Sequence, residues 1–231
     1  MNYNFKTIAT IHTDFGSKFG IPRQSGLLKK LSGVIRFEEE FRNRDALRGL
    51  EGFSHLWLLW IFSENVRDTW HPTVRPPRLG GNTRLGVFAT RSSFRPNPIA
   101  MSVVKIEQIN LETPNGPEII VSGADLLDGT PIVDLKPYLP FADNIQDATG
   151  GFTDEVPFQA LKVEISESEI KKVPVEKQEL LKELLSIDPR PAYKASKEDP
   201  ERVYGFNFAG LEIKFTVDNG KALVKKIEKS K

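Results

Sequence analysis

Short runs of β-forming residues, separated by turns, dominate the first two thirds of the chain. Strands are predicted at residues 5–11, 33–37, 52–62, 84–90, 99–109, 118–123 and 132–135, with turns at 114–116 and 128–129 between some of them. The longest apolar block, residues 56–62, suits one buried strand. Helical stretches are few, with a short one expected at 42–47. This pattern predicts a mainly β fold, a barrel or a sandwich, through about residue 163.

The sequence pattern changes near Ser166. Residues 175–185 place leucines on one face among Glu and Lys, which predicts an amphipathic helix. Three β-like runs follow at 203–208, 211–217 and 222–227, and Asn219-Gly220 is typical of a hairpin turn. We therefore expect a β-barrel domain over residues 1–165 and a small α+β domain over residues 166–231.

Several classes of function are disfavoured by what the sequence lacks. The chain has no cysteine, which excludes disulfides, iron–sulfur clusters and a cysteine nucleophile. The three histidines are too scattered for metal-ligand spacing, so no metal is expected. Neither a Rossmann glycine fingerprint, nor a P-loop, nor a nucleophile elbow occurs. There is no long apolar span and no leader-like N-terminus, so a cytoplasmic protein without membrane insertion is expected.

One stretch of the chain is strongly basic although the net charge of the whole is only +1. Residues 69–106 contain no Asp or Glu but carry six cations: Arg75, Arg78, Arg84, Arg91, Arg95 and Lys105. The same stretch is rich in Pro and Gly, which fix the backbone. Cations on stiff loops suit a phosphate or a polyanion. The alternative is a solvated basic loop whose acidic partners lie elsewhere in the fold.

Four segments combine rigid backbone with functional side chains. They are residues 19–25, which present Arg23 and Gln24 after a proline; 91–99, with an arginine on either side of Phe94; 127–138, with two aspartates, a lysine and a tyrosine; and 188–193. Arginine beside an aromatic ring can hold a phosphate and stack a base. Each segment could also be an ordinary turn, a surface ion pair or a helix stop.

Taken together, these motifs resemble the TsaA/TrmO family. The resemblance rests on Pro-Arg-Gln at 22–24, residues 49–57, 75–82 and 86–98, Asp-Gly-Thr-Pro at 128–131, Asp-Leu-Lys-Pro-Tyr at 134–138 and Asp-Pro-Arg-Pro-Ala-Tyr at 188–193. It covers nearly the whole chain in order. It implies a β-barrel S-adenosylmethionine-dependent tRNA adenine-N6 methyltransferase, usually a homodimer. The substrate it implies is the threonylcarbamoyl-adenosine beside the anticodon of certain threonine tRNAs.

The resemblance also implies a site for the methyl donor. Residue by residue it suggests Pro22, Arg23, Gln24, Ser63, Glu64, Arg91, Ile99, Asp128, Gly129, Thr130 and Pro131 as its lining. The chain departs from many relatives at Ser63-Glu64, where they have His-Gln, and at Ala100, where they have Gly.

The reaction and the substrate require further groups. Methyl transfer from a sulfonium needs in-line alignment and removal of one proton, for which Asp128 or Asp134 could serve. Candidate catalytic residues are thus Asp128, Asp134, Lys136 and Tyr138. Candidate substrate-binding residues are Arg75, Arg78, Arg84, Arg95, Arg190 and Tyr193. Two alternatives stay open: an RNA-binding barrel without catalysis, and an enzyme that acts on a small anionic metabolite.

Overall fold

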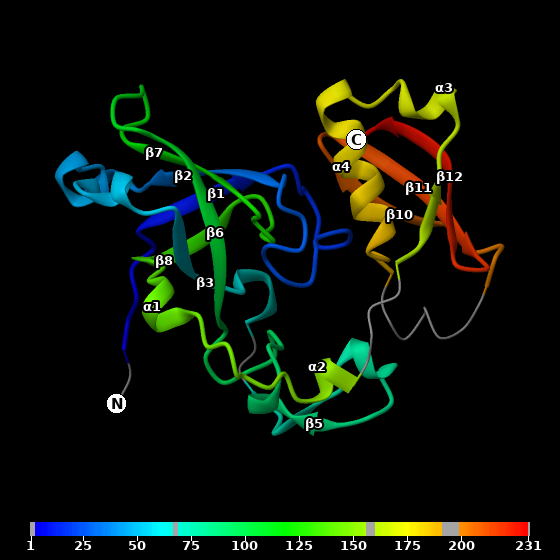
Figure 1. Cartoon of the computed structure of the whole chain (residues 1–231), viewed down its shortest axis with the longest axis horizontal. Helices are drawn as coiled ribbons and strands as arrows, with labels where there is room; N and C mark the ends of the chain where they lie inside the picture. Colours follow the sequence, from blue (N-terminus) through cyan, green and yellow to red (C-terminus); the bar gives the residue numbers. More distant parts are fainter. Residues whose placement is uncertain (1–2, 67–68, 156–159, 191–198, 231) are drawn as a thin grey trace. The chain divides into compact units, whose positions relative to one another are not determined.

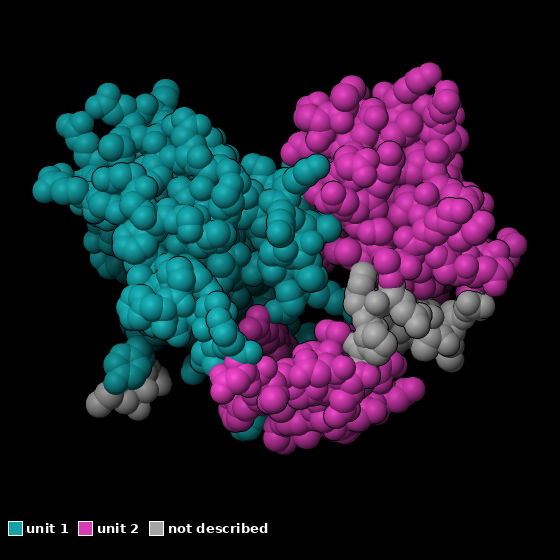
Figure 2. All heavy atoms as spheres, viewed as in Figure 1, with its two compact units in different colours: residues 1–14, 23–70, 93–146 teal, residues 15–22, 71–92, 147–231 magenta. Residues whose placement is uncertain are grey.

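In the computed structural model, which describes residues 3–66, 69–155, 160–190 and 199–230, the chain is divided into two compact units. The first unit comprises residues 1–14, 23–70 and 93–146, and the second comprises residues 15–22, 71–92 and 147–231 (Figure 2). The predicted domain boundary after residue 165 lies inside the second unit.

The first unit is a closed barrel of six antiparallel strands in the order β1-β2-β7-β6-β3-β8, with β8 pairing back to β1 (Figure 1). The strands are β1 (Ala9–Thr13), β2 (Ser32–Phe37), β3 (His55–Ile61), β6 (Ile99–Asn110), β7 (Glu118–Ser122) and β8 (Thr130–Pro137). The mainly β fold is therefore confirmed, and closure makes it a barrel rather than a sandwich.

The barrel interior is filled by alternate residues of its strands, as the two-residue period of a strand requires. Leu56, Leu58 and Trp60 of β3 point inward and are buried, whereas the alternate residues face outward and are half-buried: His55, Trp57, Leu59 and Ile61. Ile11, Ile35, Ile119 and Ile132 are among the other members of this core. The period thus fixes which side chains each strand offers to a ligand outside the barrel.

Short helices connect the strands. The 3-10 helices are Glu39–Phe41, Arg44–Leu47, Leu50–Gly52, Ser63–Asn65, Pro77–Leu79 and Val87–Ala89, and α1 (Pro140–Asp143) follows β8. The predicted strand at 84–90 is wrong for most of its length. Only β5 (Leu85–Gly86) is extended there, paired with β4 (Thr73–Val74), and the chain then turns into a 3-10 helix.

The C-terminal part of the second unit is a four-stranded sheet in the order β10-β11-β12-β9. It consists of β9 (Lys162–Glu164), β10 (Tyr204–Phe208), β11 (Leu211–Asp218) and β12 (Lys221–Lys229), with α2 (Phe152–Glu155), α3 (Glu167–Ile170) and α4 (Val175–Ser186) beside them in sequence. The four leucines of α4 are buried, as the amphipathic pattern predicts.

A segment from near the N-terminus belongs to the same unit. The ring of Phe15 lies 5.8 Å from that of Phe208, centroid to centroid, and both rings are fully buried. Gly20 has φ +99°, and a β-carbon there would lie 2.5 Å from the Phe206 ring. Residues 15–22 therefore pack against β10, and Gly20 is required for that close approach.

Candidate active site

Most of the predicted donor residues of the first unit gather at one end of the barrel. Antiparallel pairing places the ends of β1 and β3 beside the beginnings of β6 and β8: Ile61 pairs with Ile99, and Ile11 pairs with Thr130. The Ser63-Glu64 pair and residues 128–131 directly adjoin these strand ends. Barrel closure thus brings together motifs that are far apart in the sequence.

The loop after Pro22 is attached to the same end. Ser25 Oγ accepts a hydrogen bond from Val103 N at 3.1 Å, and Gly26 N donates to Gly123 O, just beyond β7. Arg23 and Gln24 are exposed on this loop. Pro22 is buried in the second unit.

The Asp-Gly-Thr-Pro turn is held tightly but leaves open space beside it. Thr130 is buried, and its hydroxyl donates to Leu127 O at 2.7 Å. Gly129 has φ +78°, which glycine adopts without strain, and a β-carbon there would meet no atom within 4 Å. Space next to this backbone therefore remains for a ligand.

Asp128 is oriented from β1. Its Oδ1 accepts a hydrogen bond from Thr13 N at 3.1 Å and lies 3.3 Å from His12 Nδ1. Both side chains of this His–Asp pair are close to half exposed. Because two partners fix the carboxylate while it remains open to solvent, Asp128 can accept a proton from a bound substrate.

The Ser63-Glu64 pair forms a 3-10 turn directly after β3. Both residues are exposed, and the turn is fixed to the start of β6 because Phe62 N donates to Pro98 O at 2.9 Å. Ile99 is half-buried at the first position of β6. Their side chains therefore border the barrel end that carries Asp128.

The other three predicted catalytic residues lie further along β8. The register of β3 and β8 shifts between Leu59 and Trp60, where β8 has one extra residue, Val133. Asp134 and Lys136 face outward opposite Leu59 and Trp57. Lys136 Nζ is 2.8 Å from Asp134 Oδ2, so the predicted shared strand face is confirmed. Tyr138 follows β8 at the opposite end of the barrel from Asp128, and its N–H donates to His55 O.

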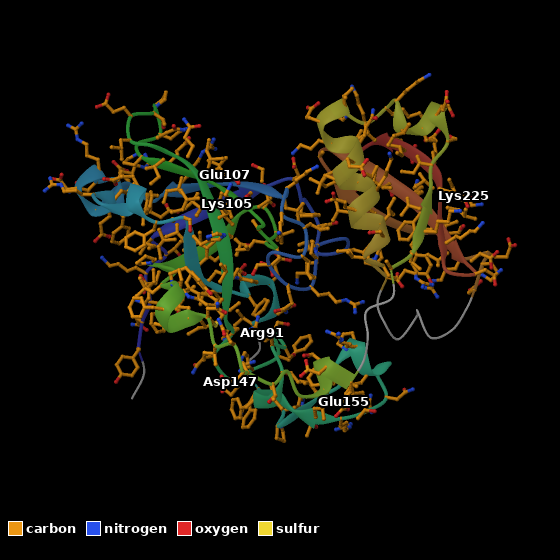
Figure 3. The ribbon with its side chains drawn as sticks, in the orientation of Figure 1. Arg91, Lys105, Glu107, Asp147, Glu155 and Lys225 are labelled. Atoms are coloured by element: carbon orange, nitrogen blue, oxygen red, sulfur yellow. The ribbon has the colours of Figure 1, made fainter. Side chains whose placement is uncertain are left out.

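The predicted basic stretch is mostly solvent-exposed. Arg75, Arg78, Arg84 and Arg91 are exposed, and Arg95 is partly buried. Arg84, directly before β5, donates from Nη1 to Oγ1 of Thr73 in β4 at 3.3 Å, and so adds a side-chain bond between the two strands' segments. Arg91, labelled in Figure 3, belongs to the second unit with the other three exposed arginines, whereas Arg95 belongs to the first.

Arg190 is not presented to solvent as the sequence suggests. It is only 6% exposed, and its Nε and Nη2 each donate to the carboxylate of Asp188 at 2.8 Å. This bidentate pair raises the pKa of Arg190. The guanidinium also lies 5.9 Å from the centre of the Tyr204 ring. In this structure Arg190 fixes the loop after α4, and Tyr193 lies outside the described residues.

Two residues near the site were missed by the sequence analysis. His12 is one, because its partner Asp128 is 116 positions away. Asp125 is the other: its Oδ1 accepts from Ser102 Oγ at 2.6 Å, and Ser102 Oγ accepts from Trp60 Nε1 at 3.0 Å. These two hydrogen bonds link Trp60, in the barrel interior, to the loop that carries Asp128. An isolated His or Asp in a single sequence gives no signal for such pairings.

Within residues 3–66, 69–155, 160–190 and 199–230, no group of three or more His, Asp or Glu side chains could hold a metal ion. In the same part of the chain no helix is long and apolar enough to cross a membrane.

Comparison with known families matches both parts of the chain. The model of the tRNA-methyltransferase O N-terminal domain matches residues 10–144, and that of the TrmO C-terminal domain matches residues 154–230. A putative S-adenosylmethionine-dependent methyltransferase of Pseudomonas aeruginosa, RcsF, is 41% identical over 220 residues, which cover 92% of each chain. These matches and the closed barrel define the class as an S-adenosylmethionine-dependent methyltransferase built on a β-barrel.

Further relatives narrow the class. The tRNA (adenine(37)-N6)-methyltransferase of Escherichia coli K12 is 42% identical over 203 residues, which cover 85% of this chain and 86% of that protein. The crystal structure of TrmO from P. aeruginosa superposes with a TM-score of 0.78 at 33% identity, covering 100% of this chain and 98% of that one. The chain belongs to the tRNA-methyltransferase O family.

Proposed function

We propose that this chain transfers the methyl group of S-adenosylmethionine to N6 of threonylcarbamoyl-adenosine at position 37, beside the anticodon of threonine tRNAs. The observation that carries the proposal is the gathering of Ser63-Glu64, Ile99 and residues 128–131 at one barrel end, beside the Arg23-Gln24 loop. Relatives named as tRNA (adenine(37)-N6)-methyltransferases support the position of the target base.

The residues at this end fit the methyl donor. Arg23 offers a cation for its carboxylate, and Asp128 and Gln24 offer polar groups for its amine and ribose hydroxyls. The open space at Gly129 admits a ligand close to the backbone. We further assign Pro22 and Arg91 to the same donor site, on the resemblance alone. The donor, when bound, supplies an activated methyl group on a sulfonium.

The proton must leave N6 as the new bond forms. The N6–CH₃ bond is made, the C–S bond breaks, S-adenosylhomocysteine leaves, and the N6 proton passes to a base. We assign that base to Asp128, because it lies at the donor end and is oriented by His12 and Thr13 N. Asp134 is bonded to Lys136 on the outer barrel face, so we assign that pair to the substrate rather than to proton transfer.

The remaining assignments follow from charge. The arginines of residues 75–95 would contact anticodon-loop phosphates, which a single-stranded loop presents together with its bases. The C-terminal part of the chain would contribute to the substrate site. We also propose that the protein is cytoplasmic and that it forms a homodimer. Light scattering on the purified protein tests the dimer.

The experiment is methyl transfer with two matched tRNAs. Purified protein with labelled S-adenosylmethionine and EDTA should methylate threonine tRNA that carries threonylcarbamoyl-adenosine, and should leave the same transcript with unmodified adenosine unlabelled. Calorimetry with the donor alone separates this enzyme from an RNA-binding barrel without catalysis. Equal labelling of free nucleotides and tRNA would instead favour an enzyme of small metabolites.

A further inference from the structure

An aromatic pocket lies on the outer face of the barrel, away from the strand ends that carry Ser63-Glu64 and residues 128–131; Val103 in its lining also bonds Ser25 of the Arg23-Gln24 loop. It is an open depression with a volume of about 490 Å³, lined by His55, Trp57, Val103, Tyr138 and Asp143. Four to six residues of β3 separate it from Ile61, which at the rise of a strand is roughly 13–20 Å. None of its residues belongs to the predicted donor site.

Three rings form the wall of this pocket. The Trp57 and Tyr138 rings have their centroids 5.9 Å apart, and the His55 and Tyr138 ring centroids are 6.2 Å apart. All three residues are half-buried, so their outward surfaces remain accessible. Packing of the rings against one another holds their faces in place before a ligand arrives, which lowers the entropic cost of binding.

One acceptor stands at the edge of the rings. Asp143 Oδ2 accepts hydrogen bonds from Trp57 Nε1 at 3.0 Å and from Leu139 N at 2.8 Å. Because both bonds go to Oδ2, the carboxylate is fixed and Oδ1 is the atom that would meet a ligand donor. The edge therefore suits a planar group with an amino donor.

The cations around the pocket are balanced. Lys105 is paired with His55 across the strands, and its Nζ lies 2.9 Å from Glu107 Oε2 (Figure 3); Lys136 is paired with Trp57 and bonded to Asp134. Local charge thus gives little net attraction for phosphate, in contrast to the arginines of residues 75–95. Recognition here rests on stacking.

We propose that this pocket stacks an unpaired nucleobase of the tRNA substrate, other than the base to be methylated, and that Asp143 favours a base with an exocyclic amino group. The proposal rests on the proposed function, since it takes tRNA as the substrate. Stacking on an aromatic side chain suits single-stranded RNA, because every base offers a π-face. The pocket would hold the anticodon loop while the target base, a few nucleotides away, reaches the donor end.

The test compares Trp57→Leu, which keeps apolar volume but removes the ring, with Trp57→Phe, which keeps a ring. The probe is an anticodon stem-loop with threonylcarbamoyl-adenosine. Trp57→Leu should weaken its binding roughly 5- to 100-fold. Donor affinity and the slope of log affinity against log salt should not change. Trp57→Phe should recover most of the affinity. Phe141→Ala, an exposed ring outside the lining, is the control and should bind as the wild type does.

Other results would overturn either the stacking proposal or the proposed function. Unchanged RNA affinity in Trp57→Leu overturns the proposal, and so does conversion of a dimer to monomers by Trp57→Leu alone, which would make this face an interface between two copies. If Trp57→Leu loses donor binding as well, Tyr138→Leu supplies the same readout from the second ring. Failure of the wild-type protein to methylate any tRNA overturns the proposed function instead, and is seen independently of these variants.

Discussion

At the scale of single residues, Asp128 carries the central chemical assignment. Asp128→Asn keeps the size and removes the base, so the single-turnover rate at saturating donor should fall by about 10²- to 10⁴-fold. Asp134→Asn breaks an exposed ion pair and should cost far less. Rapid-quench measurement of methyl transfer, at a donor concentration set by calorimetry, gives both rates. A larger loss in Asp134→Asn would reverse the assignment.

Arg190 is a second residue whose role the structure defines. Its side chain and that of Asp188 are 7% and 18% exposed, so removal of the guanidinium leaves a largely buried carboxylate without its charged partner. Arg190→Ala should lower the free energy of unfolding by about 3–5 kcal/mol. Urea unfolding followed by circular dichroism measures this, and Arg190→Ala with Asp188→Asn should recover part of it. An unchanged unfolding midpoint in Arg190→Ala would show that the pair is not structural.

At the scale of elements, the C-terminal sheet carries a carboxylate whose contribution to stability depends on pH. Lys214 and Lys226 lower the pKa of Glu228 on β12 to about 2 from its ordinary 4.5. The unfolded chain therefore binds a proton that the folded chain does not, so the contribution of Glu228 to stability is complete above pH 4.5 and is lost as the pH falls toward 2.

The variant Glu228→Gln should therefore lose less stability than the wild type over that interval. Thermal unfolding at a series of pH values measures the difference. Glu176→Gln, at an exposed position of α4, is the control for removal of one negative charge. Parallel pH profiles for the wild type and Glu228→Gln would contradict the assignment.

Elements were predicted well where the local pattern decides the structure. The strands β2, β3 and β7, the helix α4 and the hairpin at Asn219-Gly220 are where the periodicity and turn residues indicate. The strand predicted at 84–90 failed because β-forming residues need a partner strand, and only Leu85–Gly86 has one. The short parallel strand β9 was missed because its pairing with β12 is long-range.

For the site, too, local motifs could be recognised in the sequence but long-range pairing could not. The Pro-Arg-Gln and Asp-Gly-Thr-Pro motifs could be found in the sequence, since proline and glycine mark fixed backbone. Their gathering at one barrel end could not, because it follows from pairing of β1 with β8 and of β3 with β6. Nor could the burial of Arg190, which depends on contacts with Asp188 and Tyr204.

At the scale of the whole molecule, the basic stretch should govern the salt dependence of tRNA binding. For each phosphate contact removed, the magnitude of the slope of log affinity against log salt should fall by about 0.7–0.9. Arg75→Ala, Arg78→Ala and Arg84→Ala are therefore expected to flatten the slope and leave donor affinity unchanged. Arg48→Ala, an exposed arginine outside the stretch, is the control. Slopes equal to that of the wild type in all three variants would refute the polyanion argument.

Removal of residues 166–231 should affect the whole chain rather than an appendage alone. It deletes β10, β11 and β12 and so removes the contact of Phe15 with Phe208, in the segment that leads to the Pro-Arg-Gln motif at 22–24. We expect the truncated chain to bind the donor more weakly and to lose methyl transfer to tRNA. Donor calorimetry and the transfer assay on the truncated protein measure the two effects. Full activity of that protein would show that the deleted part is dispensable.

Nucleoside mass spectrometry of threonine tRNA is the most direct test of the proposed reaction. The tRNA is taken from a bacterial strain that lacks its own enzyme of this family and expresses either this chain or its Asp128→Asn variant. We predict N6-methylated threonylcarbamoyl-adenosine with the wild-type chain, and only the unmethylated nucleoside with the variant. Unmethylated threonylcarbamoyl-adenosine in both strains, with the wild-type protein present and able to bind S-adenosylmethionine, would contradict it.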